Sequence, residues 1–256
     1  MPDIALVSYI NTRPFVDGLE AAYGKDGDIR LHLLPPSDCA RALFDRQADL
    51  ALIPVGSIPI GPNLSLLPTW CIGADGPVDS VFLFSQCPIE DIEQVWLDRH
   101  SRSSNGLAQI LMRYHWKKEV RWLEPVKKHF DQIQEHTAGV VIGDEAIRIR
   151  DQFAYQYDLA EVWRDMTGLP FVFAVWAYRP GTINQGEIQR IEEALGNGVR
   201  QAETTAENWA GHFGMGIEAA TAYLTESIDY RFDARKHQAL ELYVRLLGEV
   251  RVGVRG

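Results

Sequence analysis

Short apolar runs alternate with stretches of helical spacing along the first part of the chain. Three of the runs span residues 3–7, 29–34 and 50–55. Uninterrupted runs of this length are typical of buried strands in a parallel sheet. Between them, Phe15, Leu19 and Ala22 recur at helical spacing. We predict helices that begin at Pro14, which suits a first turn, and at Ser37, which suits an N-cap. This order of elements predicts an α/β fold with a parallel sheet.

The middle of the chain repeats this alternation of predicted strands and helices, and the end of the chain does not. Further strands are predicted at residues 64–71, 94–98, 139–143 and 169–178, with a helix after residue 101. The last 75 residues predict helices only, the final one ending at Gly248.

Two stretches predict crossings between two lobes. A cluster of turn-forming residues at 73–77 precedes an extended segment, and the run at 169–178 ends in Arg179-Pro180-Gly181. We therefore predict a first lobe of residues 1–76 plus 180–256 and a second lobe of residues 77–179. Two α/β lobes joined by two crossover strands make a periplasmic-binding-protein type II-like fold. The cleft between such lobes is the expected ligand site.

Composition narrows the classes of partner. The net charge of −10 makes nucleic acid and anionic membrane surfaces poor partners. The sequence shows neither a secretory leader nor an apolar run long enough to span a membrane, and its three widely spaced cysteines (Cys39, Cys71 and Cys87) suit a reducing compartment. No His or Cys spacing is typical of a metal site, and no Gly-rich loop is present. We expect a cytoplasmic protein without cofactor or metal.

Polar side chains are concentrated directly after the first strand. Ser8, Asn11, Thr12 and Arg13 lie within six positions, just before the helix that begins at Pro14. In open α/β folds, ligands bind at the carboxyl ends of strands, beside helix N-termini. The alternative is that these side chains only cap the helix.

The segment Ser8-Tyr9-Ile10-Asn11-Thr12-Arg13-Pro14 resembles the Ser-Tyr-Leu-Asn-Thr-Lys-Pro opening of the MqnA family, the chorismate dehydratases of the futalosine pathway of menaquinone biosynthesis. Other segments that resemble the family are residues 48–55, 72–81, 101–104, 142–144, 167–176 and 223–225. The resemblance covers nearly the whole chain and implies the same two-lobe fold. Asn105-Gly106 departs from the small apolar residues that usually begin the family's helix at this point.

The resemblance implies a cofactor-independent hydro-lyase. Chorismate, a dicarboxylate, would lose its hydroxyl and a neighbouring ring proton as water, giving 3-[(1-carboxyvinyl)oxy]benzoate. Aromatisation drives this reaction, so a site of hydroxyls and amides that positions the substrate would meet its demands. Because no His occurs in a matched segment, we hypothesise that the enolpyruvyl carboxylate of the substrate itself accepts the ring proton.

The resemblance also suggests roles for individual residues. Asn11, Ser80 and Asp144 are candidate catalytic residues, with Asp144 as an orienting group or base. The candidate substrate-binding residues are Ser8, Thr12, Arg13, Ser101, Arg102, Ser103 and Ser104. Each has a structural alternative: helix capping for Asn11, Asp144 and the serines at 101–104, an ordinary strand position for Ser80, and a surface location for both arginines.

Two other functions fit the same fold. One is the sibling dihydroxy-naphthoate synthase of the same pathway. The other is a binding protein for an aromatic or dicarboxylic anion, without chemistry.

Overall fold

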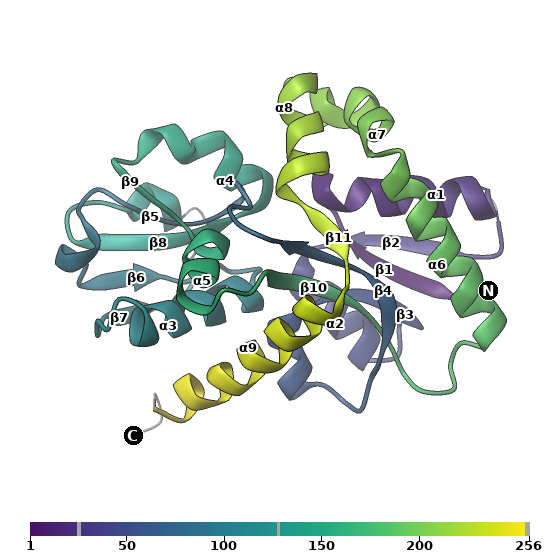
Figure 1. The fold of residues 1–256 in the computed structure, drawn as a ribbon, viewed down its shortest axis with the longest axis horizontal. Helices are drawn as coiled ribbons and strands as arrows, with labels where there is room; N and C mark the ends of the chain where they lie inside the picture. The colour runs from purple at the N-terminus through teal and green to yellow at the C-terminus, as the bar shows by residue number, and fades with distance from the viewer. Residues whose placement is uncertain (25–26, 127–128, 254–256) are drawn as a thin grey trace. The chain divides into compact units, whose positions relative to one another are not determined.

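The computed structural model describes residues 1–24, 27–126 and 129–253, which fold as two compact α/β units (Figure 1). Unit 1 combines Met1–Gly73 with Val172–Ala234, and unit 2 combines Ala74–Phe171 with the chain from Arg235 onward. The predicted crossings near residues 77 and 178 stay a prediction, and the two units divide after Gly73 and after Phe171. The third boundary differs from the predicted division, which assigned all of residues 180–256 to the first lobe. The periodicity of the last helix predicts its type but not that it packs in unit 2.

Unit 1 contains a six-stranded mixed sheet with the order β11-β4-β10-β3-β1-β2. Its strands are β1 (Asp3–Val7), β2 (Arg30–Leu34), β3 (Leu50–Pro54), β4 (Ser65–Ala74), β10 (Phe171–Tyr178) and β11 (Asp229–Arg231). β1 pairs in parallel with β2 and β3, as predicted, whereas β10 and β11 pair antiparallel with β3 and β4. The prediction of helices only after residue 181 was therefore wrong at β11, which is three residues long and too short to give a periodic signal.

The α-helices in the described residues of unit 1 are α1 (Arg13–Tyr23), α2 (Pro36–Phe44), α6 (Gln185–Arg200), α7 (Ala202–Trp209) and α8 (Ile217–Ala222). α1 and α6 pack closely because Gly18 and Gly198 meet at their crossing (Figure 1). A Cβ on Gly198 would lie 2.8 Å from the carbonyl carbon of Pro14 and 3.0 Å from Cα of Gly18. α2 is N-capped by Pro35, so the prediction of Ser37 as its cap was wrong.

Unit 2 contains a five-stranded mixed sheet with the order β7-β6-β8-β5-β9. Its strands are β5 (Val81–Ser85), β6 (Gln94–Trp96), β7 (Arg121–Leu123), β8 (Thr137–Ile142) and β9 (Tyr155–Asp158). Its helices are α3 (Arg102–Tyr114), α4 (Gly143–Ile149), α5 (Leu159–Thr167) and α9 (Ala234–Gly253). α9 continues past Gly248, contrary to the predicted end, because a single glycine costs a helix only about 1 kcal/mol.

Shorter helical turns complete the two units. The 3-10 turns are Ile10–Thr12, Val55–Ile60, Ile89–Asp91, His129–Gln132, Arg150–Gln152 and Ala210–Phe213, and a π-helical turn spans Tyr223–Ser227. None of the helices in the described part of the chain has the length and apolar character needed to cross a membrane.

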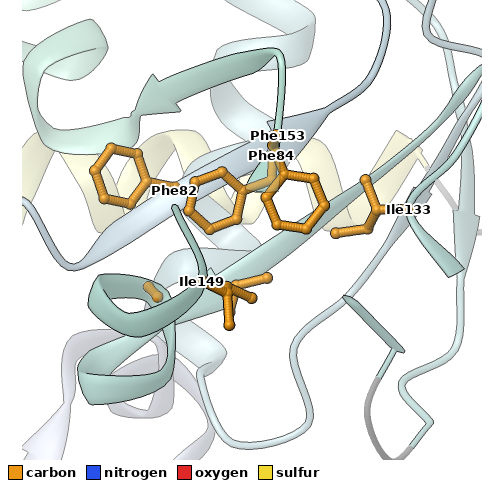
Figure 2. Close-up of a cluster of buried hydrophobic side chains, with 7 residues drawn as sticks. Phe82, Phe84, Ile133, Ile149 and Phe153 are labelled. Carbon is orange, nitrogen blue, oxygen red and sulfur yellow. The ribbon is translucent and has the colours of Figure 1, made fainter. Parts of the chain in front are cut away.

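An aromatic cluster forms one part of the core of unit 2 (Figure 2). The ring of Phe84 stacks on Phe82 of the same strand, at 5.0 Å between centroids, and on Phe153, at 4.7 Å. Ile149 at the end of α4 packs into the same cluster. The cluster therefore holds β5 and α4 against each other, and the candidate residues Ser80 and Asp144 lie at the starts of these two elements.

Candidate active site

The candidate residues fall into two groups, one in each unit. Ser8, Asn11, Thr12 and Arg13 follow β1 in unit 1, whereas Ser80, the serines and arginine at 101–104, and Asp144 belong to unit 2. Each unit therefore contributes its own set of polar side chains.

In the unit 1 group, Asn11 has a fixed side chain. It lies half-buried in the 3-10 turn Ile10–Thr12, which joins the carboxyl end of β1 to α1. The hydroxyl of Thr12 donates to Asn11 Oδ1 at 3.2 Å, and Asn11 Nδ2 donates to the hydroxyl oxygen of Tyr223 at 3.1 Å. The hydroxyl of Tyr230 donates to the backbone carbonyl of Asn11 at 2.9 Å. Asn11 is thus held in one orientation rather than used as a helix cap.

The other members of the unit 1 group differ in exposure. Ser8 has an exposed side chain, and its N–H donates to the carbonyl of Leu34 at 3.2 Å. Thr12 is buried and takes the N-cap position of α1, but its side chain makes no capping hydrogen bond.

Arg13 is buried among side chains of its own unit. Its Nη2 lies 2.9 Å from Asp17 Oδ1, and its guanidinium stacks 3.6 Å from the ring centroid of Trp209. Thr205 donates to the other oxygen of Asp17 at 2.8 Å. These contacts tie α1 to α7 and give Arg13 a structural role. Its role as a clamp for a substrate carboxylate stays a prediction.

In unit 2, Ser80 lies beside the start of α4. It is buried, and its carbonyl accepts the N–H of Gly143 at 2.7 Å. Asp144 follows Gly143 in the first turn of α4 and is half-buried. The N-cap of α4 is Ile142, without a side-chain bond, so the capping alternative does not hold for Asp144. The fold therefore brings two of the candidate catalytic residues into neighbouring positions.

The segment before Ser80 is anchored by Asp158. One carboxylate oxygen of this buried side chain accepts the N–H groups of Val78 and Asp79, both at 2.8 Å. The other accepts the N–H groups of Ala160 and Glu161, at 2.9 and 3.2 Å, and so caps α5. Asp79 has a φ of 61°, which a residue with a side chain rarely adopts.

Burial also changes the protonation of Asp158. Desolvation raises its pKa from 3.8 to about 6, against the opposite effect of the four backbone donors. The folded protein thus binds the proton of the Asp158 carboxyl group more tightly than the unfolded chain does. The stability that the protonated form contributes is complete below pH 3.8 and is lost as pH rises through about 6.

The N-terminus of α3 carries the remaining candidates. Ser101 is the N-cap: its Oγ accepts the N–H of Ser104 at 3.1 Å and donates to Ser104 Oγ at 2.7 Å. The capping alternative is therefore observed for Ser101. Ser103 and Ser104 are buried, and Arg102 is exposed. Substrate binding by these four residues stays a prediction.

Two residues that sequence patterns did not single out as functional hold this N-terminus in place. Asp98 Oδ1 accepts the N–H groups of His100 and Ser101, at 2.8 and 3.0 Å. Asn105 accepts the N–H of Asp98 and donates to its carbonyl, both at 2.8 Å.

The glycine after Asn105 serves packing. A Cβ on Gly106 would lie 2.5 Å from the hydroxyl of Tyr243 on α9, and that hydroxyl donates to the carbonyl of Ser103 at 2.9 Å. The Asn105-Gly106 departure from the family pattern thus has two structural reasons, the bracing of Asp98 and the close approach of α9.

In the described part of the chain, no three His, Cys, Asp or Glu side chains gather in a way that could hold a metal ion. Sequence reasoning did not single out Tyr223, Tyr230, Asp98, Asn105 or Asp158 as functional residues. Tyr223 falls within a segment that resembles the family, and this was the one signal available for it. The contacts of the other four are present only in the folded chain.

The fold is similar to those of several solved proteins. Protein AF1704 from Archaeoglobus fulgidus aligns with a TM-score of 0.77 at 13% identity, covering 98% of both chains. The Candida albicans CA3427 gene product, described as having the generic periplasmic binding protein fold, aligns at 0.69 with 11% identity, covering 98% of this chain and 94% of its own. The alkanesulfonate-binding protein SsuA from Xanthomonas axonopodis pv. citri aligns at 0.71 with 13% identity, covering 98% and 93%. The predicted periplasmic-binding-protein-like fold is confirmed.

The amino-acid sequence is also similar to that of a curated protein and to a protein family. A chorismate dehydratase from Thermus thermophilus is 24% identical over an alignment of 269 positions that covers 96% of this chain and 94% of that protein. Residues 2–249 match the family described as menaquinone biosynthesis. The match covers almost the whole chain, and the chain therefore belongs to the menaquinone biosynthesis family.

Proposed function

We propose that this protein is a chorismate dehydratase, a hydro-lyase that converts chorismate to 3-[(1-carboxyvinyl)oxy]benzoate and water without a cofactor. The structural observation that carries the proposal is the fixed, half-buried amide of Asn11 at the carboxyl end of β1. The near full-length relative named chorismate dehydratase favours this reaction over the naphthoate synthase alternative.

The reaction needs donors more than a strong base. The ring C–O bond to the hydroxyl breaks, the neighbouring ring C–H bond breaks, and the new double bond completes the aromatic ring. Hydroxide and proton leave together as water. Donors fixed in advance stabilise the negative charge that develops on the leaving oxygen without reorganising during the reaction.

The candidate residues divide this work. In the proposal, the second N–H of the Asn11 amide donates to the leaving hydroxyl, because an amide nitrogen carries two donors and one serves Tyr223. Ser80 adds a hydroxyl donor. The start of α3, with Ser101, Arg102, Ser103 and Ser104, supplies hydroxyl and cationic donors for a substrate carboxylate, and Ser8, Thr12 and Arg13 are the corresponding candidates after β1.

Two groups are candidates for the base. One is Asp144, in the first turn of α4, and the other is the enolpyruvyl carboxylate of the substrate. An analogue of chorismate without the enolpyruvyl group separates them. Turnover of this analogue at a normal rate would exclude the substrate carboxylate and leave Asp144, whereas its failure to react despite binding would favour the substrate carboxylate.

The test of the proposal is incubation of the purified protein with chorismate, followed by ultraviolet spectroscopy and chromatography of the product. We expect conversion by the wild-type protein, a loss of at least tenfold in kcat for Asn11→Ala, and normal turnover for the control Asn63→Ala, which alters an exposed asparagine. Binding of chorismate without conversion would refute the proposal in favour of a binding protein. Absence of both binding and conversion would also refute it.

A further inference from the structure

Asn11 is held by residues that come from the far end of the chain in sequence. Its side-chain amide has two partners, and only Thr12 is local. The other partner is the hydroxyl of Tyr223, 212 residues away, at 3.1 Å from Asn11 Nδ2. Both residues belong to unit 1. The direction of this amide is therefore decided by tertiary structure.

The backbone around Tyr223 is unusual. α8 ends at Ala222, and Tyr223 begins a π-helical turn that runs to Ser227 before β11 (Figure 1). The N–H of Ile228 donates to the carbonyl of Tyr223 at 3.1 Å and closes the turn. π-Helical turns are rare, and many of them occur at functional sites. Tyr223 itself is only 4% exposed, so its ring is fixed by packing and its hydroxyl is directed by the fold.

A second tyrosine holds the backbone of the same residue. Tyr230 on β11 is 4% exposed, and its hydroxyl donates to the carbonyl of Asn11 at 2.9 Å. Burial, and to a lesser extent Tyr223, raises the pKa of Tyr230 well above its usual value, so this phenol remains a donor at physiological pH. Its ring packs edge-to-face on Phe15 in α1, at 5.2 Å between centroids. The two tyrosines thus fix different parts of Asn11.

We propose that Tyr223 is a positioning residue, whose hydroxyl orients the side-chain amide of Asn11 toward the substrate. This inference rests on the proposed function of Asn11 and adds a residue to it. Without the hydroxyl, Asn11 keeps its backbone contact to Tyr230 and the bond from Thr12 to its Oδ1, but Nδ2 loses its bond to Tyr223 and the amide is held at its oxygen alone. The backbone stays in place, so binding of substrate is retained while the donor is misdirected.

The test compares Tyr223→Phe with Asn11→Ala and with the double variant. Tyr223→Phe removes one oxygen atom and leaves the buried ring. We expect kcat for chorismate to fall about tenfold, with KM within about twofold, since the lost hydrogen bond corresponds to about one power of ten. In the Asn11→Ala background, the same substitution should change kcat by less than twofold. Tyr155→Phe, at a 38% exposed tyrosine in unit 2, is the matched control and should leave kcat unchanged.

A second measurement does not depend on activity. The side-chain amide of Asn11 gives a pair of nitrogen–proton signals in NMR, identified by their loss in Asn11→Ala. We expect this pair to shift and to exchange faster with solvent in Tyr223→Phe, and to be unchanged in Tyr155→Phe. Thermal unfolding of each variant shows that it is folded.

The outcomes separate this inference from the proposed function. An unchanged Asn11 amide signal in Tyr223→Phe would overturn the positioning role. An equal loss of kcat with and without Asn11 would also overturn it, because Tyr223 would then act independently. If the wild-type protein does not convert chorismate while the Asn11 signal shifts as expected, the proposed function fails and the structural coupling of the two residues stands.

Discussion

The crossing of α1 and α6 makes Gly198 the residue whose enlargement should damage unit 1 most directly. Gly198→Ala adds one methyl group in the interior of α6. That carbon would overlap the carbonyl group of Pro14 and lie 3.0 Å from Cα of Gly18, so backbone lies on every near side. No side-chain rotation can relieve the overlap. The two helices have to move apart.

The size of the effect follows from two opposed contributions. Replacing glycine with alanine inside a helix favours folding by about 1 kcal/mol. The added carbon would lie 2.8 Å from the carbonyl carbon of Pro14, about 1 Å closer than the optimum for carbon atoms. Overpacking of this kind costs about 1–3 kcal/mol, and a backbone–backbone overlap belongs at or above the upper end. We expect a net loss of about 2 kcal/mol in the free energy of unfolding.

Urea unfolding followed by fluorescence measures this loss. The matched control is Gly248→Ala in α9, where an added Cβ meets nothing within 4 Å and should stabilise the protein by about 0.5–1 kcal/mol. Because α1 begins two residues after Asn11, Gly198→Ala should also lower kcat for chorismate, and Gly248→Ala should not. A Gly198→Ala protein as stable as the wild type would refute the packing argument.

Three further predictions concern charged groups. The first concerns the difference in free energy of unfolding between the wild type and Asp158→Asn. This difference should fall by on the order of 3 kcal/mol between pH 3.8 and about pH 6, because the pKa of Asp158 is raised in the folded state. A pH titration of stability checks this, and a difference that rises with pH would contradict it. Arg13→Met should cost about 1–3 kcal/mol in urea unfolding, because Arg13 is buried on Trp209 and its loss leaves Asp17 without its cationic partner; an unchanged midpoint would argue against the contact. Arg235→Met should lower the free energy of unfolding by less than about 1 kcal/mol, since the ion pair with Asp75 is solvent-exposed. A larger loss in the same assay would contradict the expectation that this exposed ion pair is weak.

Local patterns were sufficient for the elements that begin each unit. The apolar runs at β1 and β3 predicted buried parallel strands, and Pro14 predicted the start of α1, which ends at Tyr23, before Gly24 at φ 78°. These features are local, because side-chain periodicity and the allowed φ of proline and glycine act within a few residues. The same locality explains why the turn between β1 and α1 was identified as a candidate site.

Local patterns failed where a contact joins distant parts of the chain. The strand β11 exists because it pairs with β4, and α9 belongs to unit 2 because Tyr243 reaches Ser103 and Gly106 leaves room for it. Neither strand pairing nor close helix approach has a signature within one short segment.

The chain by itself determined the first strands and helices, its family and the candidate residues after β1 and at the start of α3. Only the tertiary structure decided what those residues touch. It tied Asn11 to Tyr223 and Tyr230, and it capped α5 with Asp158 while anchoring the segment before Ser80. The physical reason is that the type of an element depends on neighbours along the chain. The direction of a polar side chain depends on which donors and acceptors the completed fold brings within about 3 Å.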